Sequence, residues 1–308
     1  MRSKAVYGAD RVPRFYRGPR LQVVTLFVFV RTSQMNPVQV IAVAGGRGGS
    51  GKTNVAVNLA LGLADLGRRT MVLDADLAMA NVHELLGLTP HRTLADVLRG
   101  HCSIEQVVLQ LGGGIRILPG SCGDLDMTQL SLTQQAGLIH AVSDMQDAPD
   151  VLLIDTASGI TESTLNFIHA SRHVMVVVRD EPASINDAYS FIKLLNRNYG
   201  ISRFHILASM VHSRYEGRAL FNTLLKITDS ALSVVLEYLG DIPFDENVRH
   251  AAKKRRAVYD AYPTSKSTSA YRKIANKIDN WLLPSNPTAH LEFFGDRLFC
   301  APRARLAC

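Results

Sequence analysis

The sequence predicts a single α/β domain, with a doubly wound, mostly parallel sheet covered by helices on both faces. Three observations support this fold class. From Val38 onward short β-branched runs alternate with amphipathic stretches of helical length, most of these runs are continuously apolar, and 47% of the 308 residues are hydrophobic. A chain of this composition can bury a large core. Continuous apolar strands are typical of sheets that are covered on both faces.

Seven segments are predicted as strands because each is short, apolar and bounded by polar or glycine-containing sequence. They are Val38 to Val43, Thr70 to Leu73, Ile115 to Leu118, Val151 to Ile154, Val174 to Val178, Phe204 to Val211 and Val235 to Leu239. Five segments with apolar residues at three- and four-residue spacing are predicted as covering helices. They are Thr53 to Leu66, Leu132 to Met145, Thr161 to Ala170, Ser184 to Asn196 and Ser267 to Trp281.

Residues 1–35 lack this rhythm, so we expect a leader, a folded domain over 36–284 and a tail over 285–308. The leader is either a flexible arm or the result of a start upstream of a natural one at Met35. It holds seven of the 34 basic residues and one of the 27 acids, which leaves 27 basic and 26 acidic residues elsewhere. The excess charge therefore gives no support for a nucleic-acid-binding domain.

Neither a membrane span nor a secretory signal is predicted. The longest apolar run, Leu21 to Val30, is about half of the roughly 20 residues that a span needs, and no small-residue cleavage site follows it. The four cysteines form no C-x-x-C pair, which excludes a disulfide framework and a zinc or cluster site. These observations favour a reducing, cytosolic compartment. The cysteines are Cys102, Cys122, Cys300 and Cys308.

One segment matches G-x-x-x-x-G-K-[ST] and lies between a predicted strand and a predicted helix. Its glycines let backbone N–H groups form an anion-binding nest, and the helix directs its positive end at the phosphates. Lysine then reaches the β- and γ-phosphates, while the threonine hydroxyl ligates Mg²⁺. The segment is Gly46, Arg47, Gly48, Gly49, Ser50, Gly51, Lys52 and Thr53. A Gly-rich helix cap alone would not require Lys then Thr after the last glycine.

Three carboxylates follow predicted strands at the same sheet edge. Asp155 directly follows Val151 to Ile154 and is expected to face Mg²⁺. The alternative, a cap for the helix near Thr161, is disfavoured because Asp155 lies too far ahead of it. Asp74 and Asp76 follow the second strand. Asp76 is the candidate for orienting the attacking water and contacting the metal, whereas Asp74 could instead cap the following helix.

With these motifs in place, the chain resembles the deviant-Walker ATPases related to MinD and ParA, most closely the flagellar-number regulators of the FleN/FlhG type. The resemblance covers about residues 37–299. It rests on the phosphate loop, on D-A-D-L-A-M-A-N-V-H at Asp74 to His83, on D-E-P-A-S-I-N-D-A-Y at Asp180 to Tyr189, and on I-P-F-D-E-N-V-R at Ile242 to Arg249.

The resemblance implies an ATP- and Mg²⁺-dependent homodimer that controls flagellar number and placement. It implies that the protein antagonises a flagellar transcription activator and works with an FlhF-type GTPase at the cell pole. Arg47 stands at the loop's signature lysine, which reaches the partner subunit's phosphates in the family, so we count it with Lys52 and Asp76 as catalytic. Its planar guanidinium either acts like an arginine finger or fits the site badly.

Other positions depart from the family pattern. Ala78 stands where the family usually has glycine, His83 where it has aspartate, and Ser209 where an asparagine near adenine is usual. Base recognition then depends on Ser209 and on the loop that begins Pro243, Phe244, Asp245. The residues leave ATP and GTP as alternatives.

The tail carries an apolar stripe that the resemblance connects with membrane contact. The stripe consists of Leu291, Phe294 and Leu298, flanked by Phe293 and Phe299. It is expected either to lie at the inner membrane surface or to pack on its own domain. The basic cluster Arg249 to Arg256 is interpreted as a solvated helix face, because no aromatic residues accompany it.

Three rival functions stay open. A MinD- or ParA-like division or partitioning ATPase would bind bulk DNA in a salt-dependent way, which the near-neutral domain disfavours. An iron-sulfur carrier would need paired cysteines, and Cys102 and Cys122 do not suit that arrangement. A nucleotide-binding module without turnover is compatible with Arg47 and Ala78.

Overall fold

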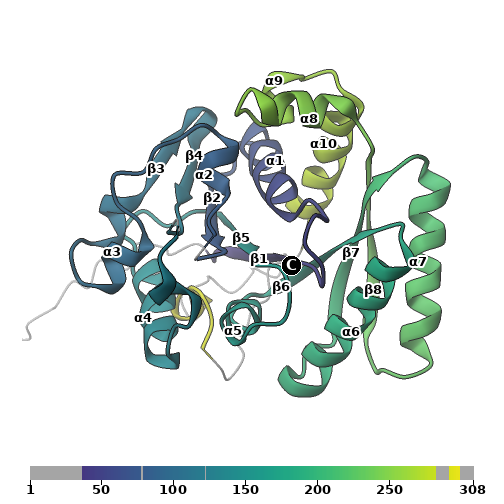
Figure 1. Ribbon diagram of the computed structural model, residues 1–308, viewed down its shortest axis with the longest axis horizontal. Coiled ribbons are helices and arrows are strands. Elements are labelled where there is room, and N and C mark those ends of the chain that lie inside the picture. Colours follow the sequence, from purple (N-terminus) through teal and green to yellow (C-terminus); the bar gives the residue numbers. More distant parts are fainter. Residues whose placement is uncertain (1–36, 78, 122, 282–290, 299–308) are drawn as a thin grey trace, which may run out of the picture. The chain divides into compact units, whose positions relative to one another are not determined.

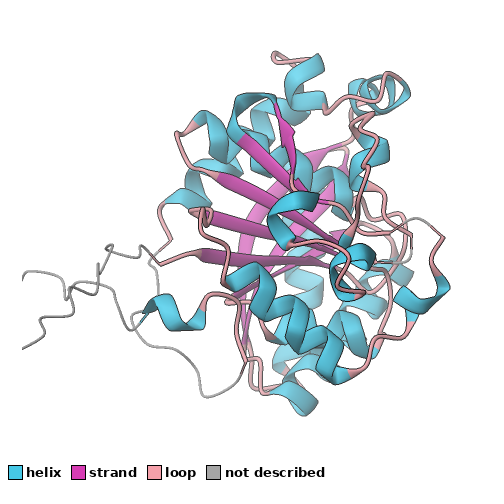
Figure 2. Cartoon of the chain, turned by 90° about the vertical axis from the view of Figure 1, so that its left-hand side faces the viewer, coloured by secondary structure: helices cyan, strands magenta, loops and turns pink. Residues whose placement is uncertain are grey.

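The computed structural model describes residues 37–77, 79–121, 123–281 and 291–298, which belong to one compact unit. Within these ranges the strands form a single eight-stranded sheet (Figure 2). The predicted fold class is confirmed. In spatial order the strands are β3 (Leu109–Leu111), β4 (Ile115–Leu118), β2 (Thr70–Ala75), β5 (Val151–Thr156), β1 (Gln39–Ala44), β6 (His173–Arg179), β7 (Arg203–Val211) and β8 (Val235–Pro243).

All seven predicted strands are present, and several extend further than expected. The second and the fifth strand include the acids that were expected just beyond them, Asp74 and Asp155. The prediction lacks β3, which pairs antiparallel with β4 at the sheet edge. The three glycines 112–114 reverse the chain between these two strands, and Gly113 and Gly114 have φ near +79°. Three half-exposed residues give too short a pattern for a strand prediction.

The strand order reverses at β1, which lies between β5 and β6. After β1 the chain continues to β2, on the β5 side of β1. After β5 it crosses to β6, on the opposite side of β1. At such a reversal the connections leave in opposite directions, which opens a crevice at the carboxyl ends of the strands. The loop after β1 and the end of β5 both lie at this crevice.

Helices cover both faces of the sheet (Figure 1). One face packs against α1 (Lys52–Asp65), α8 (Glu246–Lys253), α9 (Val258–Ala261) and α10 (Lys266–Asp279). The other face packs against α4 (Leu132–Ser143), α5 (Glu162–His169), α6 (Pro182–Tyr199) and α7 (Arg214–Asp229). Two short helices, α2 (Val82–Leu85) and α3 (Leu94–Leu98), follow β2, and single 3₁₀ turns lie at Ile104–Val107, Leu125–Thr128 and Gly295–Leu298.

The five predicted helices are confirmed, with ends that shift by at most three residues. The prediction lacks α7, although Leu220, Phe221 and Leu224 bury one of its faces, and it also lacks the shorter α8. Contact between α1 and α10 is close, because a Cβ on Gly62 would lie only 3.0 Å from the Ala275 Cβ. This contact holds the helix after the phosphate loop firmly against the sheet.

The C-terminal segment corrects part of the membrane prediction. Phe293 and Phe294 are buried in the core, and the Phe293 ring stacks on Phe167 with centroids 6.2 Å apart. The Phe293 N–H donates to the Ala170 carbonyl at 3.0 Å, and Glu292 forms a buried ion pair with Arg172. These two phenylalanines therefore follow the alternative prediction and pack on their own domain. Their apolar rings are removed from water by the core, as they would otherwise be by a membrane.

The other residues of the apolar stripe do not share the burial of Phe293 and Phe294. Leu291 is 40% exposed, and Leu298 ends the 3₁₀ turn Gly295–Leu298. Phe299, residues 1–35 and Ala78 lie outside the described residues, so the predicted domain limits stay predictions. Among the helices that the structure describes, none is long and apolar enough to cross a membrane.

Candidate nucleotide-binding site

The loop between β1 and α1 has the backbone that a phosphate loop requires. Gly49 and Gly51 have φ of +78° and +92°, in the left-handed region that side chains with a Cβ rarely adopt. A Cβ on Gly46 would lie 2.7 Å from the backbone oxygen of Asp187, so only glycine fits there. Gly51 is also the N-cap of α1, without a side chain over the helix end. The first N–H groups of α1 therefore lie beside the loop, where they can bind an anion.

Lys52 is the first residue of α1, and its side chain lies over the end of β5. It is only 6% exposed, and its Nζ donates to the Ser158 Oγ at 2.9 Å. Burial lowers the pKa of Lys52, while Asp155 and Asp76 oppose this shift. Ser158 was not among the predicted site residues; its position three residues after Asp155 was the available signal.

Asp155 is buried at the carboxyl end of β5, and its Oδ1 has no hydrogen-bond partner among the described residues. Burial raises its pKa to about 7, while the Thr53 hydroxyl and the Lys52 ammonium favour the charged form. An unpartnered carboxylate oxygen beside a threonine hydroxyl is the kind of oxygen donor that Mg²⁺ prefers. The residues present therefore fit this ion, with its other ligands left to phosphate and water.

The two acids of the second motif differ in their surroundings. Asp74 is fully buried beside Asp155 in the sheet register, and its Oδ2 accepts the Val82 N–H at 2.9 Å. It caps α2, as the alternative interpretation expected. Burial, and then the charge of Asp155, raise its pKa well above the usual value. Asp76 follows β2 and is half-buried; burial raises its pKa, and Lys52 is close enough to lower it. Asp76 thus lies near Lys52.

Arg47 lies apart from these groups. Its side chain is 57% exposed, and its guanidinium lies 3.8 Å from the Asp187 carboxylate on α6. The contact is loose and solvated, so it costs little to break. Arg47 is therefore free to contact a second molecule.

The residues predicted to surround the base have unequal roles. Ser209 is buried in β7, and its Oγ lies 3.5 Å from the place where a Cβ on Gly51 would be. Phe244 is 43% exposed beside His212, with ring centroids 5.5 Å apart, and follows Pro243 at the end of β8. These two residues remain candidates for base contact.

Asp245 differs from the prediction, because its carboxylate is already engaged. Its Oδ1 accepts the Asn247 N–H at 3.0 Å, which caps α8. Its Oδ2 accepts the N–H and the hydroxyl of Ser267, at 3.0 and 2.9 Å. Both oxygens of Asp245 are thus engaged within the protein, where they tie α8 to the start of α10 and position the loop.

Comparison with known proteins identifies the family. Residues 38–202, more than half of the chain, match the AAA domain family. The chain is 58% identical over 268 residues to the antiactivator FleN of Pseudomonas aeruginosa, which covers 87% of this chain and 96% of FleN. The chain belongs to the MinD/ParA-type ATPases. It is also 28% identical over 236 residues to the flagellum site-determining protein YlxH of Helicobacter pylori, covering 76% of this chain and 80% of YlxH.

Solved structures show the same fold. The cell division ATPase MinD of Pyrococcus furiosus superposes with a TM-score of 0.66 at 23% identity, covering 79% of this chain and 99% of MinD. MinD of Pyrococcus horikoshii, determined with Mg-ADP, has a TM-score of 0.66 at 22% identity, with 79% and 97% covered. The predicted family of MinD/ParA-type ATPases is confirmed.

Proposed function

We propose that this protein is a Mg²⁺-dependent ATPase that acts as a switch in setting the number and placement of flagella. The observation that carries the chemistry is the convergence of Lys52, Thr53, Asp155 and Asp76 at the crevice beside β1. The biological class rests on the 58% identity to the antiactivator FleN and on the similarity to YlxH, a flagellum site-determining protein.

Each residue has a defined task in this proposal. The loop amides and Lys52 bind the phosphates, and Lys52 exchanges the Ser158 hydroxyl for a phosphate oxygen. Thr53, and Asp155 through a water, hold Mg²⁺, which neutralises charge on the phosphates when it is bound. Asp76 orients the attacking water, and its raised pKa brings its carboxylate closer to the range where it can take up a proton.

The switch works through a homodimer that forms with ATP. Arg47 is exposed beside the loop and is held only by a loose contact to Asp187, so it can reach the partner subunit's phosphates. Different partners then bind the two nucleotide states. By the resemblance, these are a flagellar transcription activator, which the dimer antagonises, and an FlhF-type GTPase. The proposed location is the cytoplasm, at the inner face of the cell pole.

A nucleotide-binding module without turnover is the second candidate. The observation that favours it is Arg47 itself, because a planar guanidinium does not present charge as a lysine ammonium does. A MinD- or ParA-like role in division or partitioning also fits the family. Counting flagella in cells that lack the protein separates that role from the proposed one.

The decisive experiment measures mass by light scattering after gel filtration of the full chain. Asp76→Ala should bind ATP without hydrolysing it, and so form a dimer with ATP and Mg²⁺ but a monomer with ADP. Glu105→Ala, a change of an exposed acid outside the site, should hydrolyse ATP like the unmodified chain. A monomer under both conditions would contradict the switch. ATP turnover by Asp76→Ala at the unmodified rate would contradict the role of this aspartate.

A further inference from the structure

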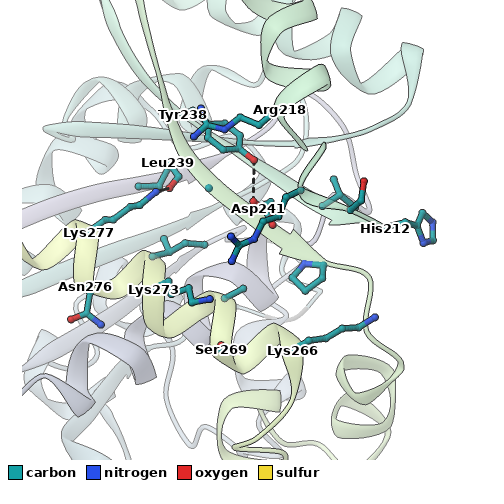
Figure 3. Close-up of a pocket in the computed structure, with 17 residues that line it drawn as sticks. His212, Arg218, Tyr238, Leu239, Asp241, Lys266, Ser269, Lys273, Asn276 and Lys277 are labelled. Atoms are coloured by element: carbon teal, nitrogen blue, oxygen red, sulfur yellow. Dashed lines mark hydrogen bonds between the residues drawn. The ribbon is translucent and has the colours of Figure 1, made fainter. Parts of the chain in front are cut away.

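A groove of about 950 Å³ runs along the free edge of β8, away from the phosphate loop (Figure 3). β8 is the last strand of the sheet and pairs only with β7 in the part of the chain that the structure describes. One wall comes from α7, and the other comes from α10, which lies alongside β8 in Figure 3. The floor is therefore a strand edge whose outward N–H and C=O groups lack a neighbouring strand.

The groove is lined by five cationic side chains, all in exposed positions. They are Arg214 and Arg218 on α7, and Lys266, Lys273 and Lys277 on α10. The three lysines are spaced by seven and four residues, so they share one face of α10. Among the described residues none of these five forms an ion pair. Their charge is left for a ligand.

Two of these cations are oriented by groups of β8. The Arg218 guanidinium lies 4.3 Å from the centre of the Tyr238 ring, and the Lys277 Nζ donates to the Leu239 carbonyl at 2.6 Å. The one acid that lines the groove, Asp241, accepts the Tyr238 hydroxyl at 3.1 Å. Lysines beside an edge strand discourage unspecific pairing. A segment that pairs at Leu239 has to displace Lys277 from this carbonyl.

We propose that this groove binds an acidic, extended segment of a partner protein, which adds a strand to the edge of β8. The free edge offers main-chain hydrogen bonds, and the flanking cations select carboxylates at the alternate positions that face them. Half-buried Ala270 supplies apolar surface between the charges. Five residues of β8 between Tyr238 and Pro243 line the groove, and this stretch sets the length of segment that can pair.

A peptide fits this groove better than a nucleic acid. A nucleic acid would leave the unpaired backbone of β8 unused, whereas an extended peptide can pair with it. Outside residues 1–35 the chain has 27 basic and 26 acidic residues, so its overall charge gives no support for nucleic-acid binding. The proposal does not depend on the proposed function, because its five cations lie outside the phosphate loop. Pro243, which begins the loop predicted to contact the base, also lines the groove.

Fluorescence anisotropy on the full chain tests the proposal. The probe is a fluorescein-labelled nine-residue peptide of alternating glutamate and valine. Lys273→Glu should weaken binding at least about tenfold, because it replaces an attraction with a repulsion at the centre of the wall. Arg197→Glu on α6 makes the same change in net charge at an exposed position outside the groove and should leave binding unchanged. ATP binding should be unaffected in both variants.

Two further probes separate the mode of binding. The same peptide, N-methylated at alternate amides, should bind at least about tenfold more weakly, since it cannot extend the sheet. A nine-nucleotide oligothymidylate should not compete with the peptide. Absence of peptide binding at millimolar concentration would overturn the proposal, as would equal binding of the methylated peptide. Oligonucleotide binding that Lys273→Glu abolishes would assign the groove to nucleic acid.

Discussion

Lys52 is the residue on which phosphate binding should depend most. Its ammonium is buried and contacts only a hydroxyl, although burial disfavours its charge. Lys52→Met should weaken binding of a fluorescent ATP analogue by roughly 10- to 100-fold, since a charge-assisted hydrogen bond contributes about 1.5–3 kcal/mol. Titration of the analogue by fluorescence checks this expectation.

The same substitution should not unfold the protein, because methionine has a similar length and removes a buried charge. Its melting temperature in the absence of nucleotide should equal or exceed that of the unmodified chain. Lys226→Met, an exposed lysine on α7, serves as control and should leave affinity unchanged. If Lys52→Met bound the ATP analogue with unaltered affinity, the loop would not be part of the nucleotide site.

Buried His205 and its half-buried neighbour His173 should make the stability of the domain depend on pH. The His205 ring stacks on Trp281 with centroids 4.0 Å apart, and the His173 ring is tilted against Trp281 with centroids 4.7 Å apart. Burial lowers the pKa of both histidines to about 4, and the cation of Arg203 adds to this effect. Glu237, 3.1 Å from the His205 Nδ1, favours the charged ring, but the cost of burial is larger.

The sign of the effect follows from the lowered pKa. Between about pH 6.5 and pH 4 the unfolded chain binds more protons at these sites than the folded one, so stability falls as pH falls. His205→Phe keeps the stack but does not titrate. The loss of unfolding free energy from pH 7 to pH 5 should therefore be smaller by about 2 kcal/mol in this variant. Urea unfolding followed by the fluorescence of Trp281, the single tryptophan of the chain, measures it. An unchanged difference would show that His205 is not the titrating group.

At the scale of elements, the C-terminal segment should stabilise the domain. Phe293 is fully buried against Phe167. Phe293→Ala should lower the free energy of unfolding by about 3–5 kcal/mol, the usual cost of deleting a buried aromatic ring. Leu291 lies two residues before Phe293 but is 40% exposed, so Leu291→Ala should lower the free energy of unfolding by less than about 1 kcal/mol. Urea unfolding measures both variants. If Phe293→Ala were as stable as the unmodified chain but no longer bound lipid vesicles, the membrane role predicted for Phe293 would be supported instead.

The sequence predicts elements well where one pattern is repeated over many residues. Strands buried on both faces, such as Val151–Thr156, are continuous apolar runs, and the long helices have a clear apolar face. Sequence-based prediction fails where tertiary contacts determine the structure of a segment. Leu109–Leu111 is a strand only because glycines fold it back on its neighbour, and the stripe around Phe293 has the same pattern whether it meets a membrane or a core.

The candidate site is predicted to a similar extent. The loop and Asp155 are evident because their residue types and spacing are chemically demanding. Sequence cannot distinguish a carboxylate that faces a ligand from one that caps a helix, and Asp74 and Asp245 both turn out to hold backbone N–H groups. Ser158 could be placed in the site only from the structure, because its contact with Lys52 joins residues 106 positions apart.

At the scale of the whole molecule, Arg47 should separate nucleotide binding from assembly. Its guanidinium is exposed and makes one loose contact, to Asp187, so it contributes little to the isolated subunit. Arg47→Ala should therefore bind the fluorescent ATP analogue normally. In the Asp76→Ala background it should fail to dimerise with ATP and Mg²⁺, because no cation then reaches the partner's phosphates.

Two matched variants sharpen this prediction. Asp187→Ala removes the carboxylate beside Arg47 while leaving the backbone oxygen against Gly46, so ATP-dependent dimerisation should be retained or strengthened. Arg47→Lys tests whether the charge alone suffices or whether the planar fork is needed. Light scattering with ATP and with ADP gives the mass of each variant. A dimer of unchanged affinity in Arg47→Ala would mean that the subunits meet without this residue, and that the switch depends on other contacts around the crevice.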